Sequence, residues 1–272
     1  MKPTIKILFD ELGQQVAVHE THGDRLTGFY RVIDHQGWQR EVGPVTAANL
    51  ADVNVLVLTN RVQAGYSAQE ICDVVNFVHD GGGLWCMANH AAFNGNSASN
   101  QLNNHVRFDS AISTTFFTDF KAAAYQSTDP AERFVTLEGD NLKDHPILNG
   151  GPSSWPSLRQ NGNREIHKVV TRSFCGVYTN SLSTTLVGLD GLDHVANTQT
   201  GEGVGPRVAW AVALEGENVT GQGRAVICAD AGWLGDVESS TPGPGAFQEP
   251  YNPQFALNTL SWLAKLGLLA LT

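Results

Sequence analysis

Apolar runs of strand length alternate with helical patterns through the first 90 residues of the chain. The runs lie at residues 5–9, 53–59 and 84–88, and a short further strand is expected around Glu41 and Val42. Apolar side chains at helical spacing indicate helices over 26–33 and 67–78. The run 53–59 is mostly apolar and β-branched, which is typical of a strand buried on both faces of a parallel sheet. This alternation predicts a doubly wound α/β sheet with right-handed crossovers.

Polar residues mark the ends of these elements. Residues 13–23 predict a polar loop after the first strand, with Asp24 as the cap of the first helix and Gly37 at its end. Ser67 and Glu70 have the spacing of a capping box and predict the start of the second helix. The second helix is therefore predicted both by its cap and by its apolar stripe.

The rest of the chain is less regular. Strands are predicted at 166–172, 184–189, 207–214 and 224–229. Residues 190–206 predict an exposed loop, and Pro253 is expected at the first position of a C-terminal helix. Residues from about 107 to 165 predict an irregular insertion or lid. We expect a single α/β domain over residues 1–272 that includes this insertion.

Composition narrows the range of partners. The 272 residues include 17 Lys and Arg against 27 Asp and Glu, which gives a net charge of −10. An acidic surface does not suit a phosphate backbone, so nucleic-acid binding is not expected. There is no basic run to hold an anionic membrane and no apolar run near the ~18 residues of a membrane span. Residues 1–11 lack the apolar region of a secretion signal, which predicts a cytoplasmic or already mature chain.

Motifs for covalent catalysis and for nucleotide binding are absent. The sequence has no G-x-S-x-G elbow, and its glycines form neither a P-loop nor a G-x-G-x-x-G after a strand. We therefore expect no nucleotide cofactor. The four cysteines form no CxxC pair and predict buried free thiols rather than a disulfide frame or a zinc site. They are Cys72, Cys86, Cys175 and Cys228.

Acidic, amide and imidazole side chains follow the predicted strands at their carboxyl ends, where open α/β sheets bind ligands. Oxygen ligands suit Ca²⁺, and carboxylates combined with imidazoles suit Zn²⁺. The expected ligands of a divalent metal ion are Asp10, Glu11, His22, Asn89 and Asp230. The alternative is structural: Asp10 and Asp230 would cap neighbouring backbone amides.

Four stretches of the sequence resemble a known family. They are the strand with its two acids at 5–11, ADVNVLVLTN at 51–60, SAQEICDVVNFVHDGGGLWCMANHAAF at 67–93, and the closing stretch that begins AVICADAGWLGD at residue 225. Together they resemble uncharacterised prokaryotic members of the class I glutamine-amidotransferase-like superfamily, relatives of trehalose-utilisation-type proteins. The resemblance implies a flavodoxin-like three-layer α/β sandwich with a mostly parallel central sheet.

The chain departs from that superfamily at two functional positions. True amidotransferases carry a Cys nucleophile at the elbow and a His–Glu pair near the C-terminus. Here Asn89 and His90 stand at the elbow, and residues 229–232 read Ala-Asp-Ala-Gly. Glutamine hydrolysis is therefore not expected, and the crevice at the carboxyl ends of the strands is expected to have a different function.

Three functions fit this crevice. The first is a metal-dependent hydrolase of an ester, lactone or amide, with His90 and Glu11 as catalytic residues, because metal-bound water can replace a Ser or Cys nucleophile. The second is a non-catalytic module that binds a carbohydrate or another small ligand. The third is an assembly subunit with a vestigial site.

The side chains expected to contact a small-molecule substrate are Asn89, Phe93, Trp155 and Trp233. The sequence leaves open the substrate, the metal and whether the chain forms a homo-oligomer.

Overall fold

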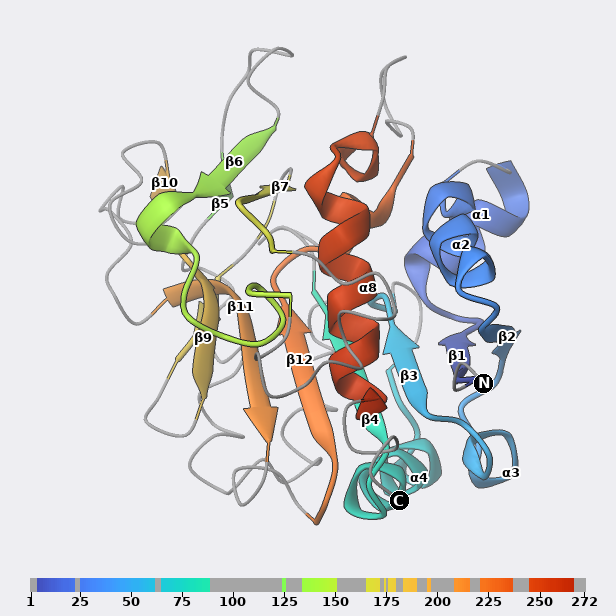
Figure 1. Cartoon of the computed structure of the whole chain (residues 1–272). Helices are drawn as coiled ribbons and strands as arrows, with labels where there is room; N and C mark the ends of the chain where they lie inside the picture. Colours follow the sequence, from blue (N-terminus) through green and yellow to red (C-terminus); the bar gives the residue numbers. More distant parts are fainter. Residues whose placement is uncertain are drawn as a thin grey trace.

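The computed structural model describes residues 4–22, 25–61, 65–88, 124–125, 134–150, 165–171, 174, 176–179, 183–189, 195–196, 208–215, 221–236 and 245–266. Their centre is an eight-stranded sheet in the order β2-β1-β3-β4-β12-β11-β8, with β9 also paired to β11 (Figure 1). The strands are β1 (Lys6–Asp10), β2 (Gln39–Gly43), β3 (Val55–Leu58), β4 (Gly83–Met87), β8 (Val177–Tyr178), β9 (Thr184–Gly188), β11 (Val208–Glu215) and β12 (Arg224–Cys228).

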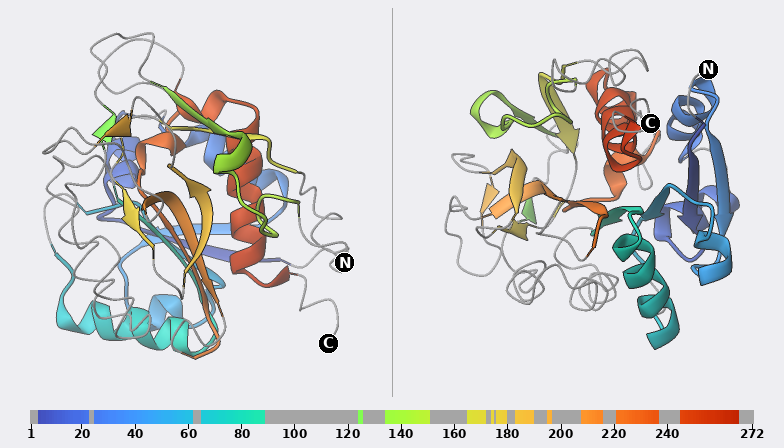
Figure 2. Two further views of the ribbon diagram at one scale, coloured as in Figure 1. Left: turned by 90° about the vertical axis from the view of Figure 1, so that its left-hand side faces the viewer. Right: turned by 60° about the horizontal axis from the view of Figure 1, so that its bottom comes forward.

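The sheet is parallel from β2 to β12 and antiparallel at β11 and beyond. Helices α2 (Thr27–His35) and α8 (Tyr251–Leu263) cover one face, and α3 (Ala47–Leu50) and α4 (Ala68–His79) cover the other (Figure 2). The predicted three-layer α/β sandwich with a mostly parallel central sheet is confirmed. The strand predicted at 53–59 is central, because β3 lies between β1 and β4.

Smaller elements complete the described part of the chain. β5 (Ala124–Tyr125) pairs with β10 (Val195–Ala196), and β6 (Val135–Glu138) pairs with β7 (Lys168–Thr171), both antiparallel. Three short 3-10 turns are η2 (Gly139–Asn141), η4 (Gly232–Leu234) and η5 (Ala246–Gln248). Most of 107–165 and 190–206 lies outside the described residues, so the lid and the exposed loop stay predictions.

An aromatic cluster fills the space between the sheet and the α2–α8 layer. Ring centroids lie 5.6 Å apart for Phe9 and Phe29, 5.9 Å for Phe29 and Trp85, and 5.9 Å for Trp85 and Trp233. Phe255 of α8 completes the series, 5.5 Å from Trp233. Such pairs add ~0.5–1.5 kcal/mol each beyond the burial of their area. The cluster therefore joins β1, β4, α2, η4 and α8 into one core.

The capping box of α4 is confirmed. Ser67 Oγ accepts from the Glu70 backbone N–H at 3.2 Å, and the Glu70 carboxylate accepts from the Ser67 N–H at 2.8 Å. Ile71, Val74 and Val78 form the buried stripe that the spacing predicted.

The predicted loop over 13–23 is wrong, because helix α1 spans Gln14–His22. The helix has only a weak apolar period, since among its side chains that the structure describes only Gln15 and Val16 are buried. The helix therefore lacks the periodic apolar stripe by which helices are predicted from sequence.

The predicted starts of two helices also need correction. α2 is capped from a distance: the Gly28 backbone N–H donates to the Asp236 carboxylate, and Asp24 lies outside the described residues. α8 begins at Tyr251, so Pro253 is its third residue rather than its first. Proline is tolerated throughout the first helical turn, because backbone N–H groups there have no intrahelical acceptor.

The cysteine prediction holds in part. Cys86 and Cys228 are buried and form no disulfide among the described residues, whereas Cys72 is exposed on α4, and Cys175 lies outside the described residues. Burial raises the pKa of the Cys228 thiol, and Trp85 Nε1 donates to its Sγ at 3.3 Å. This thiol is therefore a packed core group. None of the described helices is long and apolar enough to cross a membrane.

Candidate functional site

The candidate site lies at the edge of the sheet where the parallel strands end. Asp10 is the last residue of β1, Arg61 follows β3, and Asp230 follows β12. The arrowheads of β3 and β12 point toward this edge in Figure 1.

A buried ion-pair network occupies the β1–β3 part of this edge. Arg61 donates from Nε to Asp10 Oδ2 at 2.6 Å and from Nη2 to Asp10 Oδ1 at 3.0 Å. The same Nη2 lies 2.7 Å from Glu70 Oε1. The side chains of Arg61 and Asp10 are 1% and 0% exposed. The Arg61 guanidinium also lies over the Tyr66 ring, 4.1 Å from its centroid.

The network stabilises the charged forms of Arg61 and Glu70. Burial lowers the pKa of Arg61, but the hydrogen bonds to Asp10 and Glu70 outweigh it, so the net pKa is raised. Burial raises the pKa of Glu70, but hydrogen bonds from Arg61 and Ser67 lower it overall. Burial, together with the nearby Asp10, raises the pKa of Tyr66, which stays a neutral phenol. Arg61 therefore remains a cation that neutralises Asp10 throughout the physiological range.

Asp230 is held by a second set of contacts. Its Oδ2 accepts from Thr171 Oγ1 at 2.8 Å, and its Oδ1 accepts from the Gly232 N–H at 2.6 Å. Trp210 Nε1 donates to the same Thr171 hydroxyl at 3.0 Å. These bonds join β7 to the end of β12, which matches the structural alternative named for Asp230.

The sheet order keeps Asp10 and Asp230 apart. Their strands are separated by β3 and β4, so three strand spacings of ~4.8 Å lie between them, about 14 Å in all. Metal–oxygen distances of ~2.0–2.6 Å do not let two aspartates bridge that gap. Within the described ranges, no three His, Cys, Asp or Glu side chains gather as metal ligands would.

The other expected site residues are distributed as follows. Glu11 is exposed and follows Asp10 in the chain. His22 is the last residue of α1, and its side chain is outside what the structure describes. Asn89, His90, Phe93 and Trp155 lie outside the described residues. Trp233 needs correction as a ligand-contacting residue, because it is 0% exposed within the aromatic cluster.

Sequence analysis missed three side chains at this edge. Arg61 is one, and its signal was a cation three residues after a central strand in a chain with only 16% charged residues. Gln15 and Thr59 are the others, 2% and 0% exposed. Gln15 Oε1 and Thr59 Oγ1 are buried and have no hydrogen-bond partner in the part of the chain that the structure describes. Buried polar atoms are rarely left in this state, so these two need an explanation.

The sheet order and layers define a flavodoxin-like α/β sandwich. The mmIFT52 N-terminal domain is similar, with a TM-score of 0.60 at 10% identity, over 95% of this chain and 97% of that chain. A ThuA-like protein from Bacteroides uniformis has a TM-score of 0.51 at 14% identity, over 96% of this chain and 91% of its own. A cytoplasmic protein from Salmonella typhimurium LT2 has a TM-score of 0.51 at 12% identity, over 95% of this chain and 99% of that chain.

These likenesses establish the fold alone, in agreement with the resemblance to trehalose-utilisation-type proteins. No protein-family model matches the sequence, and no curated protein matches it.

Proposed function

We propose that the chain is a non-catalytic binding domain for a small polyhydroxylated molecule of about monosaccharide size, held beside the ends of β1 and β3. The observation that carries this proposal is that Gln15 Oε1 and Thr59 Oγ1 are buried without a hydrogen-bond partner among the described residues. Gln15 follows β1 and Thr59 follows β3, the two strands whose ends hold the Asp10–Arg61 ion pair. An amide oxygen accepts and a hydroxyl both donates and accepts, which suits a ligand rich in hydroxyl groups.

The burial of these atoms limits the size of the ligand. Both atoms are closed off from solvent, so a ligand that reaches them is enclosed, which favours a small molecule over a polymer chain. Stacking on tryptophan contributes little to this proposal. The tryptophans that the structure describes are at most 4% exposed, and they are Trp38, Trp85, Trp210, Trp233 and Trp262.

The metal-dependent hydrolase has less support. It requires Asp10 to exchange a buried guanidinium for a metal ion, and its catalytic His90 lies outside the described residues. The assembly subunit also has less support, because Leu12 and Val42 are the only exposed large apolar side chains within the described ranges. A sizeable apolar patch would favour such a role.

Calorimetric titration of the full chain with a panel of monosaccharides and polyols tests the proposal. We expect one of them to bind, and Thr59→Val to weaken that binding by about tenfold, since a hydrogen bond to a buried hydroxyl is lost. Thr136→Val on the exposed face of β6 is the matched control and should bind like the native chain. Equal affinities for all three proteins would refute the assigned site.

A further inference from the structure

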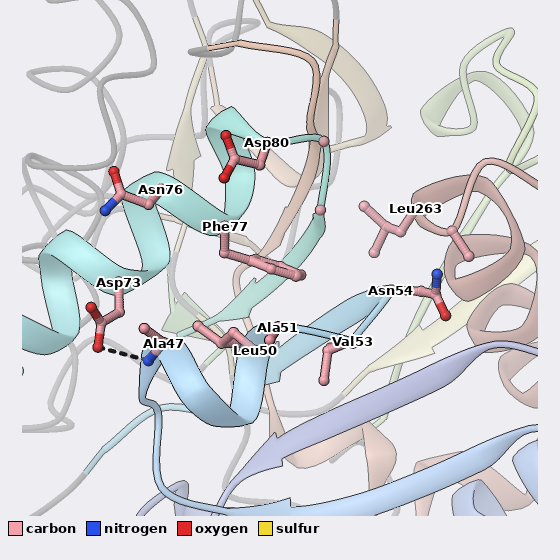
Figure 3. A pocket seen from close by; sticks show the side chains of 13 residues that line it. Ala47, Leu50, Ala51, Val53, Asn54, Asp73, Asn76, Phe77, Asp80 and Leu263 are labelled. Carbon is pink, nitrogen blue, oxygen red and sulfur yellow. Dashed lines mark hydrogen bonds between the residues drawn. The ribbon is translucent and has the colours of Figure 1, made fainter.

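A hollow lies at the edge of the sheet opposite the Asp10–Arg61 ion pair, before the first residues of β3 and β4. It has a volume of about 360 Å³ and is bounded by α3, α4 and the last residues of α8 (Figure 3). This volume lies within the range of small-molecule sites. In Figure 3 the Phe77 ring lies in the middle of the hollow, with Asn76 and Asp80 to one side and Asn54 and Leu263 to the other.

The α4 side of the hollow is polar. Asp73, Asn76, Phe77 and Asp80 have the spacing of one helix face, while the buried stripe of α4 packs against the sheet. This face lines the hollow, so two carboxylates and one amide border it.

Asp73 is the unusual group, because it is a buried carboxylate without a counter-charge. It is 7% exposed. Its Oδ2 accepts from the Ala47 N–H at 2.9 Å and its Oδ1 from Gln69 Nε2 at 2.8 Å, both neutral donors. Each carboxylate oxygen can accept a further hydrogen bond. A buried aspartate is ordinarily paired with a cation, which Asp73 lacks among the described residues.

The lining as a whole is negative. It includes Asp73 and Asp80, and no Lys, Arg or His is among the described residues that form it. At the rim, His79 Nδ1 is 3.0 Å from Asp80 Oδ1, and Lys265 donates to the Gln222 carbonyl near Gly81. We propose that this hollow binds a small organic cation, an alkylammonium or alkylguanidinium, with its charge toward Asp73 and Asp80 and its alkyl part against Phe77 and Leu263.

Titration of the ¹⁵N-labelled full chain with n-butylammonium chloride tests this proposal, with 1-pentanol as a neutral probe of similar size and sodium chloride as the salt control. We expect saturable amide shifts at the residues that line the hollow with butylammonium only. N-acetyl-lysine amide places the same cation on a peptide backbone. If this probe binds more tightly than butylammonium, the cation that the hollow accepts is a side chain of a partner protein. If it binds more weakly, the cation is a free amine.

Two variants and one control make the test specific. Asp80→Asn should weaken butylammonium binding about two- to fivefold, as expected for an exposed charge. Asp73→Asn should weaken it at least about tenfold. Asp140→Asn, an exposed acid on η2, changes the net charge equally and should leave binding unchanged. Equal shifts with pentanol, or equal losses in Asp80→Asn and Asp140→Asn, would overturn the proposal. The site at the β1–β3 edge is independent of this result.

Discussion

The Arg61 guanidinium and the Asp10 carboxylate form a two-point ion pair at 2.6 and 3.0 Å, with both side chains buried. A buried pair of this kind is costly to break, because one charge is left without its partner. Arg61→Met is therefore expected to lower the free energy of unfolding by about 3–5 kcal/mol, measured by urea denaturation.

The double variant Asp10→Asn with Arg61→Met separates pairing from packing. Because it leaves no buried charge on Asp10, it should be more stable than Arg61→Met alone. If the two substitutions instead destabilise additively, the charges of Asp10 and Arg61 are not coupled.

Asp236 caps α2 from the loop after β12, through the Gly28 backbone N–H. Asp236→Ala should cost about 1 kcal/mol in unfolding free energy, the usual loss for a helix cap. Gly28→Ala should also destabilise the chain, because its Cβ would overlap the Asp236 carboxylate. In the Asp236→Ala background this Gly28→Ala penalty should shrink. An undiminished penalty would argue against the contact.

His145 makes the stability depend on pH. Burial, together with the nearby Arg224, lowers the pKa of His145 to about 4, against about 6.5 in the unfolded chain. Between these values the unfolded chain binds the extra proton, so stability is full above about pH 6.5 and falls as the pH drops toward 4. The loss is on the order of 3 kcal/mol. Urea midpoints across pH 4–7 should fall less in His145→Gln than in the native chain, and parallel curves would refute the assignment.

Asn252 substitutes for a strand partner of Val170. Its side chain accepts from the Val170 N–H at 2.9 Å and donates to the Val170 carbonyl at 2.6 Å. Asn252→Ala leaves both backbone groups without this partner, so a loss of about 2–4 kcal/mol is expected by chemical denaturation. Gln254→Ala, two residues further along α8, is the control and should cost much less. Equal losses would show that the Asn252 amide adds nothing specific.

The sequence predicted the fold where local signals agree with the tertiary structure. The capping box at Ser67 and Glu70 and the apolar run of β3 are sufficient on their own to place α4 and the sheet centre. Helix α1 was missed because its apolar pattern is weak, and the α2 cap was missed because Asp236 lies 208 residues from Gly28. Such long-range partners leave no trace in local spacing.

The candidate site was less predictable for the same reason. Asp10 was identified from its place at a strand end, but its partner Arg61 lies 51 residues away, and the pairing depends on β1 and β3 being neighbours. The separation of Asp10 from Asp230 likewise follows from strand order. The sequence shows which residues end the strands and therefore lie at this edge of the sheet. The distances between those residues can be known only once the order of the strands is known.

The central claim is that the site at the β1–β3 edge binds its ligand without converting it. The most direct measurement is a saturation-transfer NMR time course on the full chain with the polyol and monosaccharide panel and a set of simple esters and lactones, with Ca²⁺, Mg²⁺, Mn²⁺ and Zn²⁺ added singly. We expect transfer to the protons of an intact hydroxylated ligand and no new signals with any ion. Product signals that require a divalent ion and disappear in Asp10→Asn would contradict it and restore the metal-dependent hydrolase.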